Sequence, residues 1–217
     1  NNIIGSVVTT SSAYSFIGGG WNNKIGGEVE GESWEYTQGT FIGGGYYNEI
    51  KGNSSNAVIG GGNANHIKGN SNLSVIGGGG TGSQFGLGNI ITNGPLGTII
   101  GGSGNAITNA VGATTVLNAT VLGGKNNLAN GNYSVVAGLQ AKAGGHPGVF
   151  VFADSTTTDF TANAENSAHF GVANGLRVVG PSITLDTNPG VPTVEGHVLT
   201  SDADGVGTWQ AIPPPPT

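Results

Sequence analysis

SFIGGGWNNKI, residues 15–25, is the stretch that decides the fold, because it recurs along the first two thirds of the chain. The early copies are close and the later ones are looser. They are TFIGGGYYNEI (40–50), AVIGGGNANHI (57–67), SVIGGGG (74–80), TIIGGSGNAI (98–107), TVLGGKNNLA (120–129) and SVVAGLQAKA (134–143). Self-similarity at a short spacing indicates a repeat architecture, in which each repeat is one small supersecondary unit.

Each copy predicts two short strands joined by a glycine-rich turn. Two apolar residues form the first strand, the glycines allow a backbone path closed to other residues, and Asn-x-Ile forms the second strand. One unit has an apolar side that it cannot bury alone. Stacked units bury it, because each Ile or Val then packs on the one before it, about 4.8 Å away. The predicted fold is therefore an all-β parallel solenoid.

The apolar anchors of the first strand set the length of a coil. We take them to be Ile17, Ile42, Ile59, Ile76, Ile100, Leu122 and Val136, which are 25, 17, 17, 24, 22 and 14 residues apart. The shortest spacing is read as the bare coil, so the excess in the others is loop inserted at one corner. We expect these insertions at residues 26–39, 80–97 and 109–118, and added loops are where recognition usually resides.

Composition supports an ordered β repeat. The chain has 217 residues, of which 43 are Gly, 8% are charged and 36% are hydrophobic. Glycine without a strict three-residue period argues against collagen, and the recurring apolar anchors argue against disorder. A thin coil has little interior of its own, so we expect copies of the chain to associate.

Charge and residue usage exclude several classes of partner. The net charge is −6 with only six Lys or Arg, which argues against nucleic acid and anionic membrane surfaces as partners. No apolar run approaches the roughly 20 residues of a spanning helix. The chain has no Cys, so disulfides do not stabilise it, and the absence of Met leads us to expect a piece of a longer protein.

The repeats resemble the head repeats of trimeric autotransporter adhesins, also called YadA-like head or Hep-Hag repeats, and related segments of phage-type tail fibres. The resemblance rests on (S/T)-x-I-G-G-G-x-x-N-x-I-x-G and covers residues 1–143. It implies a left-handed parallel β-roll built by a homotrimer, placed extracellularly, at a cell surface or in a virion tail fibre. Three glycines where many members have fewer, and the long insertions, are departures that leave the ligand open.

The last third of the chain has a different pattern. Residues 144–180 alternate apolar and polar side chains at Val149, Val151, Leu176 and Val178, which predicts a small antiparallel β connector. Residues 181–217 predict an extended neck with a β-hairpin around Asp202–Gly205 and a Pro-rich end. Both segments resemble stretches that follow such repeats in fibre proteins.

Motifs for chemistry are weak. Gly77, Gly79 and Gly82 have the spacing of a dinucleotide fingerprint, but no helix pattern follows them. His66, His146, His169 and His197 are scattered, so only a threefold axis would gather them around a metal. Asp202 and Asp204 are turn formers as well as possible calcium ligands. We therefore predict no catalytic residue, no metal site and no cofactor.

Carboxylates in the first insertion leave an enzymatic alternative open. Glu28, Glu30, Glu32 and Glu35 accompany Trp34 and Tyr36, which is the composition of a glycan-cleaving site between subunits. That alternative is a tailspike-like polysaccharide depolymerase. A solvated acidic loop that keeps a fibre soluble is the simpler interpretation.

Aromatic residues are the most informative functional feature. Trp21 and Tyr46 both follow the third glycine of their repeats, and Tyr47 follows Tyr46. If these rings face outward they suit stacking on sugars or on an apolar protein surface, whereas if they face another chain they are interface packing. With the loop residues Trp34, Tyr36 and Phe85, they are the predicted ligand-binding set. The leading hypothesis is a fibre segment that binds a cell-surface glycan or envelope protein, with a purely structural shaft as a further alternative.

Overall fold

The computed structural model describes residues 2–4, 13–26, 37–81, 88–155, 158–179, 197–201 and 207–211. It divides the chain into two units, Asn1–Leu176 and Arg177–Thr217, which are described separately below.

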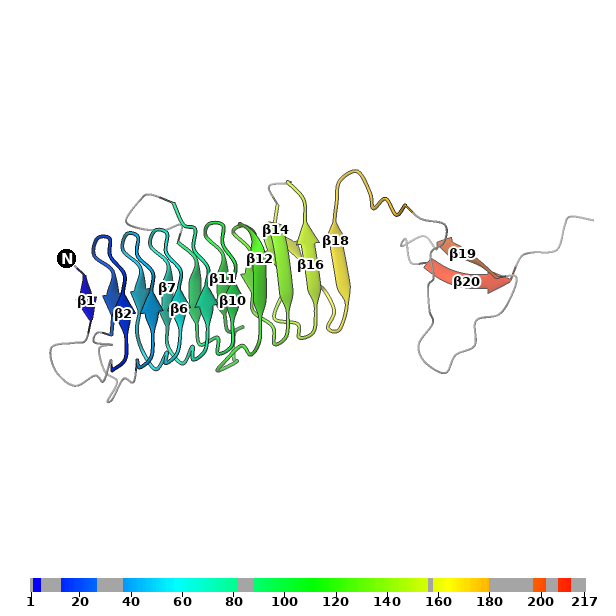
Figure 1. Cartoon of the computed structure of the whole chain (residues 1–217). Helices are drawn as coiled ribbons and strands as arrows, with labels where there is room; N and C mark the ends of the chain where they lie inside the picture. Colours follow the sequence, from blue (N-terminus) through cyan, green and yellow to red (C-terminus); the bar gives the residue numbers. More distant parts are fainter. Residues whose placement is uncertain are drawn as a thin grey trace, which may run out of the picture. The chain divides into compact units, whose positions relative to one another are not determined.

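The first unit is a flat roll of two nine-stranded parallel sheets (Figure 1). We name them the odd sheet and the even sheet, because successive strands alternate between them and each coil contributes one strand to each. The odd sheet contains β1 (Ile3–Ile4), β3 (Lys24–Ile25), β5 (Glu49–Ile50), β7 (His66–Lys68), β9 (Ile90–Thr92), β11 (Ala106–Thr108), β13 (Leu128–Ala129), β15 (Ala141–Lys142) and β17 (Phe160–Thr161). The even sheet contains β2 (Phe16–Ile17), β4 (Phe41–Ile42), β6 (Val58–Ile59), β8 (Val75–Ile76), β10 (Thr98–Ile99), β12 (Thr120–Lys125), β14 (Val135–Leu139), β16 (Phe150–Ala153) and β18 (Ala168–Gly171). The parallel roll predicted from the repeats is confirmed.

Two columns of aliphatic side chains fill the space between the sheets. Most strands place one residue inward, and equivalent residues of neighbouring coils are in-register partners, so like side chains stack on like. These inward residues are fully buried. They are Ile25, Ile50, Ile67, Ile91, Ile107 and Ala129 in the odd sheet, and Ile42, Ile59, Ile76, Ile99, Val121, Val136 and Val151 in the even sheet. Burying one such side chain contributes about 1.5–3 kcal/mol.

A buried asparagine column runs beside the odd-sheet aliphatic column. The backbone N–H of each Asn donates to the Oδ1 of the Asn one coil earlier, and the column ends where the N–H of Ala141 donates to Asn127. Each amide group also donates to glycine carbonyls, as Asn105 Nδ2 does to Gly101 at 2.9 Å and to Gly124 at 3.0 Å. The members are Asn23, Asn48, Asn65, Asn89, Asn105 and Asn127. The amide groups thus tie the glycine turn of each coil to that of the next, and the Gly124 carbonyl also accepts the backbone N–H of Ser103.

The anchors predicted in the fifth and sixth repeats, residues 98–107 and 120–129, are off by one residue. Ile99 and Val121 are the buried partners of Ile76 and Val136, whereas Ile100 is 57% exposed and Leu122 is 46% exposed. A register irregularity between Val121 and Gly123 places Leu122 outside the ladder. With this correction the shortest coil, from Val121 to Val136, is 15 residues long.

The second predicted insertion is shorter than expected, because residues 80–97 include an ordinary strand. β9 pairs in register with β7 and β11, and Asn89 occupies the usual place in the asparagine column. In the third insertion, residues 109–118, Val116 is buried and Val111 is exposed.

Residues 144–180 do not form an antiparallel region. β16 pairs parallel to β14 and to β18, and β17 pairs parallel to β15, so both ladders continue through this segment. The antiparallel prediction was wrong because alternating apolar and polar residues specify a half-buried strand but not the direction of its partner.

In the second unit, β19 (His197–Ser201) and β20 (Gly207–Ala211) form an antiparallel hairpin, as predicted. Asp202 and Asp204 lie outside the described residues.

Candidate functional site

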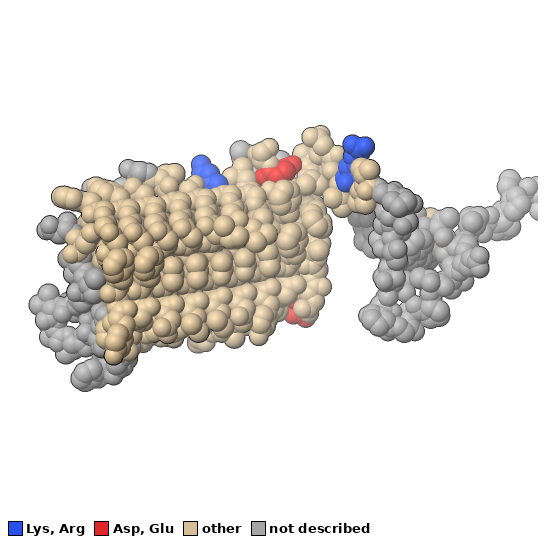
Figure 2. All heavy atoms as spheres, in the orientation of Figure 1, with Lys and Arg blue, Asp and Glu red and all other residues tan. Residues whose placement is uncertain are grey.

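The outward sides of the two sheets differ sharply in polarity. Outward residues of the even strands are mainly apolar, and Figure 2 shows a face of the roll whose middle carries no charged side chain among the described residues. This column contains Phe16, Phe41, Val58, Val75, Thr98, Thr120, Val135, Phe150 and Ala168. With the exposed Leu73, Ile100, Leu122 and Phe152 beside it, we name it the apolar face. Phe16 and Phe41 stack within it, with ring centroids 5.6 Å apart.

The odd strands present a mixed column, in which charged and polar residues lie beside Ile90, Ala106 and Leu128. Their outward column contains Lys24, Glu49, His66, Ile90, Ala106, Leu128, Lys142 and Thr161. Among the described residues, no exposed large hydrophobic side chain lies on an odd strand. The outward side of the even sheet is therefore the more apolar side of the roll, and the outward side of the odd sheet is the more polar one.

Trp21 and Tyr46 lie at the turn that leads from the even to the odd strands. Their backbones are bridged to one another, and Tyr46 is bridged to Asn63 in the next coil. The Trp21 side chain is 57% exposed and Tyr46 is half-buried. The sequence left open whether these rings face outward or face another chain, and in the single chain both side chains are at least partly accessible to solvent.

Tyr47 lies beside Tyr46 but belongs to a different surface. The two rings meet edge to face with centroids 4.5 Å apart, and Tyr47 adopts a left-handed backbone conformation with φ of 55°. That conformation, uncommon for a residue with a side chain, directs the chain into β5. Tyr47 thereby lines a groove on the outward side of the odd sheet.

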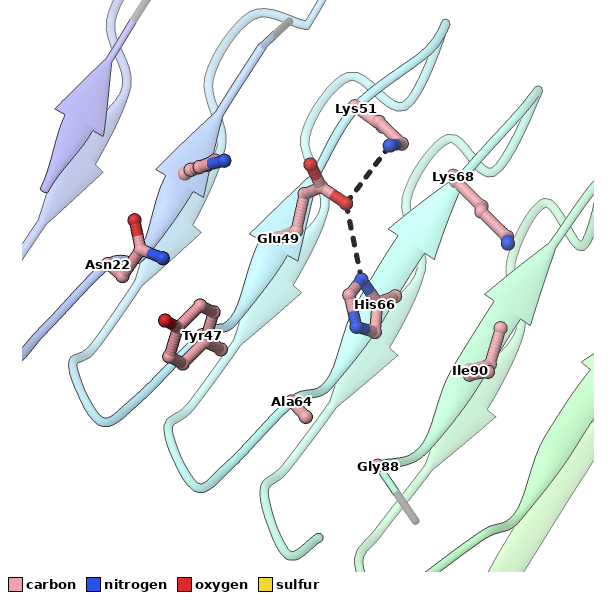
Figure 3. Close-up of a pocket in the computed structure, with 10 residues that line it drawn as sticks. Asn22, Tyr47, Glu49, Lys51, Ala64, His66, Lys68, Gly88 and Ile90 are labelled. Atoms are coloured by element: carbon pink, nitrogen blue, oxygen red, sulfur yellow. Dashed lines mark hydrogen bonds and ion pairs between the residues drawn. The ribbon is translucent and has the colours of Figure 1, made fainter. Parts of the chain in front are cut away.

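The groove gathers half of the cationic residues of the chain. Lys24, Lys51 and Lys68 line it with Tyr47, Glu49 and His66, and we name this set the cationic groove (Figure 3). Its volume is about 450 Å³, and a second hollow of about 280 Å³ adjoins it and shares Lys51 and Lys68.

Among the described residues that line the groove, Glu49 is the only carboxylate, and it is already engaged. Its Oε2 lies 3.1 Å from Lys51 Nζ and 3.2 Å from His66 Nδ1. Partial burial alone would raise the pKa of Glu49, but the hydrogen bond to His66 and the charge of Lys51 outweigh it and lower that pKa to about 2. Among the described residues, Lys24 and Lys68 make no ion pair, so the groove presents three ammonium groups against one carboxylate.

Comparison with known proteins gives no family. No model of a protein family matches the sequence, and no curated protein matches it. The site is therefore interpreted from its own residues.

Three of the predicted ligand-binding residues, Trp34, Tyr36 and Phe85, lie outside the described residues, as do Glu28, Glu30, Glu32 and Glu35. Sequence reasoning missed the cationic groove. A signal was present, because Lys24, Glu49 and His66 all occupy the middle position of Asn-x-Ile in successive repeats.

One pair of side chains has the composition of a catalytic dyad but not its geometry. Ser167 Oγ lies 2.7 Å from His169 Nε2 and also donates to the Ala164 carbonyl at 2.7 Å. A hydroxyl has one proton, so His169 must be the donor to Ser167 and does not act as its base. Among the described residues there is no group of three metal-ligating side chains and no helix able to cross a membrane.

Proposed function

We propose that this chain is a segment of a homotrimeric fibre on the outside of a cell or a virion, and that it binds a surface glycan. The observation that carries the proposal is the apolar face. In this column Phe16, Phe41 and Val75 are exposed and Val58, Val135 and Phe150 are half-buried, and an aligned set of apolar side chains in contact with water is typical of an interaction surface.

The repeated geometry of the roll favours association of identical chains. Outward residues of the even strands are in register from coil to coil, so the apolar face is a straight strip rather than a scattered set. Identical strips packed around one axis would remove them all from water. The number three comes from the resemblance to trimeric fibre heads.

Glycan binding is supported by the placement of the aromatic pair. Trp21 and Tyr46 lie at the turn rather than within the apolar face, so their rings stay accessible when the even sheets pack together. Aromatic rings with a polar edge suit the apolar faces of sugars. Three such sites on one rigid trimer gain avidity when they engage one surface.

The oligomer is tested by adding charge to the apolar face. Phe41→Glu with Val75→Glu places two carboxylates of each chain in the interface, whereas Ala106→Glu with Thr161→Glu adds the same charge to the outward column of the odd sheet. We expect sedimentation equilibrium to give a trimer for the parent and the odd-sheet variant, and a folded monomer for the even-sheet variant. A parent that is a folded monomer at micromolar concentration would overturn the proposal.

The ligand is tested on a glycan array with the labelled trimer. We expect binding that falls at least about tenfold when Trp21 is changed to Ala, because a buried stacked ring contributes more than about 1.4 kcal/mol. Val111→Ala, at the exposed side chain in the third insertion, is the control. An array without hits would contradict glycan binding. It would not bear on the trimer, which sedimentation equilibrium tests separately.

A further inference from the structure

The outward side of the odd sheet holds a charge distribution opposite to that of the whole chain. The net charge is −6, yet three of the six Lys and Arg residues line one groove. They come from segments up to 44 residues apart in sequence, which the stacking of β3, β5 and β7 brings together. Lysines that only keep a surface soluble repel one another and would be expected to lie apart rather than around one groove.

We infer that the cationic groove binds an acidic sugar, one that carries a ring carboxylate, and this inference rests on the proposed glycan-binding function. The ammonium groups of Lys24 and Lys68 have no ion-pair partner among the described residues and can accept a carboxylate as ligand. A charge-assisted hydrogen bond of this kind is stronger than a neutral one.

Glu49 does not oppose an incoming anion, because its charge is compensated inside the groove. Lys51 and His66 hold its Oε2 at 3.1 and 3.2 Å, and Figure 3 shows both contacts converging on that oxygen. Glu49 instead fixes the positions of Lys51 and His66, and Lys68 makes no ion pair with any carboxylate of the described residues.

The shape and the aromatic lining favour a sugar over other anions. Successive odd strands are about 4.8 Å apart, so Lys24 and Lys68 lie on strands about 10 Å apart, and the Tyr47 side chain projects into the strip that they border. A sugar presents an apolar ring face to Tyr47 and a carboxylate to a lysine at once. The adjoining hollow adds Asn70 and Thr92, whose side chains suit hydroxyl groups.

The placement of the groove agrees with the proposed trimer. The groove lies on the odd sheet, and the apolar face lies on the even sheet, so packing through one leaves the other in contact with solvent. Each trimer would then present three equivalent cationic grooves.

The test compares oligogalacturonate with the same oligosaccharide after methyl esterification, using the whole 217-residue chain and isothermal titration calorimetry. We expect the acid form to bind and the ester to bind at least about tenfold more weakly, as loss of one charge-assisted bond predicts. Lys68→Gln should weaken binding of the acid by a similar factor. Lys125→Gln, which removes the same charge outside the groove, should leave it unchanged.

The outcomes separate this inference from the proposed function. Equal binding of acid and ester, insensitive to Lys68→Gln, would overturn the acidic-sugar assignment while glycan binding stands. A hexaglutamate peptide that binds as tightly as the oligogalacturonate would also overturn it, in favour of an acidic protein partner. Failure of the trimer to bind these sugars and every glycan on the array would overturn both proposals.

Discussion

At the scale of single residues, the glycines of the repeat have separate roles. Gly102 has φ of 92°, and a Cβ there would overlap the carbonyl oxygen of Gly124 in the next coil. Gly101, its neighbour, has no positive φ, and a Cβ there would meet nothing closer than the Gly78 carbonyl at 3.9 Å. One glycine is required by the close approach of two backbones, and the other is not.

This difference predicts opposite effects for two adjacent substitutions. Gly102→Ala should lower the free energy of unfolding by at least about 2 kcal/mol, from backbone strain and the displaced carbonyl. Gly101→Ala should be neutral or stabilising by up to about 1 kcal/mol, because it restricts the unfolded chain. Urea unfolding followed by circular dichroism measures both, and equal losses would contradict the assigned roles.

Glu49 is the residue that links stability to pH. Its pKa in the folded chain is about 2 against an ordinary value of 4.5, so its ionised form stabilises the fold above about pH 4.5 and this stabilisation is lost as the pH falls toward 2. Its side chain is 20% exposed, which limits the contribution to about 1–3 kcal/mol.

We therefore expect parent and Glu49→Gln to differ in unfolding free energy at pH 6, and the difference to vanish as the pH approaches 2. Glu165→Gln, at an exposed carboxylate, serves as the control. A constant difference across this pH range would show that Glu49 stabilises the fold by packing rather than by charge.

At the scale of strands, the register of β10 decides which of two adjacent isoleucines is core. Ile99 is fully buried and pairs with Ile76 and Val121, and Ile100 points outward. Ile99→Ala should cost about 2–5 kcal/mol of stability, as for other buried large-to-small changes, and Ile100→Ala less than about 1 kcal/mol.

The same urea titration distinguishes the two isoleucines. Protein concentration must be held fixed, because the proposed trimer forms through residues near Ile100 and association makes the measured stability depend on concentration. If Ile100→Ala lowered the free energy of unfolding more than Ile99→Ala, at a concentration where both variants are monomeric, then Ile100 would be the buried residue, as the sequence predicted.

At the scale of the whole first unit, the roll is nearly one-dimensional, because each coil contacts only its neighbours. Residues 58–74 make one complete 17-residue coil, since Val58 pairs with Val75 and Ile59 with Ile76. Removing them lets β4 pair with β8 and β5 with β9 in unchanged register.

A chain without residues 58–74 should fold, with a parallel β spectrum and a moderately lower melting temperature. A chain without residues 58–65, which lacks half a coil, should not, because the next strand would enter the wrong sheet. Circular dichroism and limited proteolysis compare the two. Equal folding of both would show that register between coils is not what holds the roll together.

The sequence by itself determined the parallel roll and the stacked columns of Ile and Val, and it left open whether Trp21 and Tyr46 face outward or face another chain. It could do so because a strand alternates sides every residue and a stacked repeat places like residues on like. In TII (98–100) and TVL (120–122), two adjacent residues are aliphatic, so the alternation alone does not say which of the two is buried. The pairing of neighbouring strands decides this, because it places Ile99 and Val121 in register with the buried Ile76.

Only the tertiary structure decided that β16, β17 and β18 continue the two ladders, and that one side of the roll is apolar while the other gathers Lys24, Lys51 and Lys68 around Glu49. The physical reason is that loops of different length separate the coils. Residues that meet across neighbouring strands therefore have no constant spacing along the chain, and their meeting is fixed by strand pairing alone.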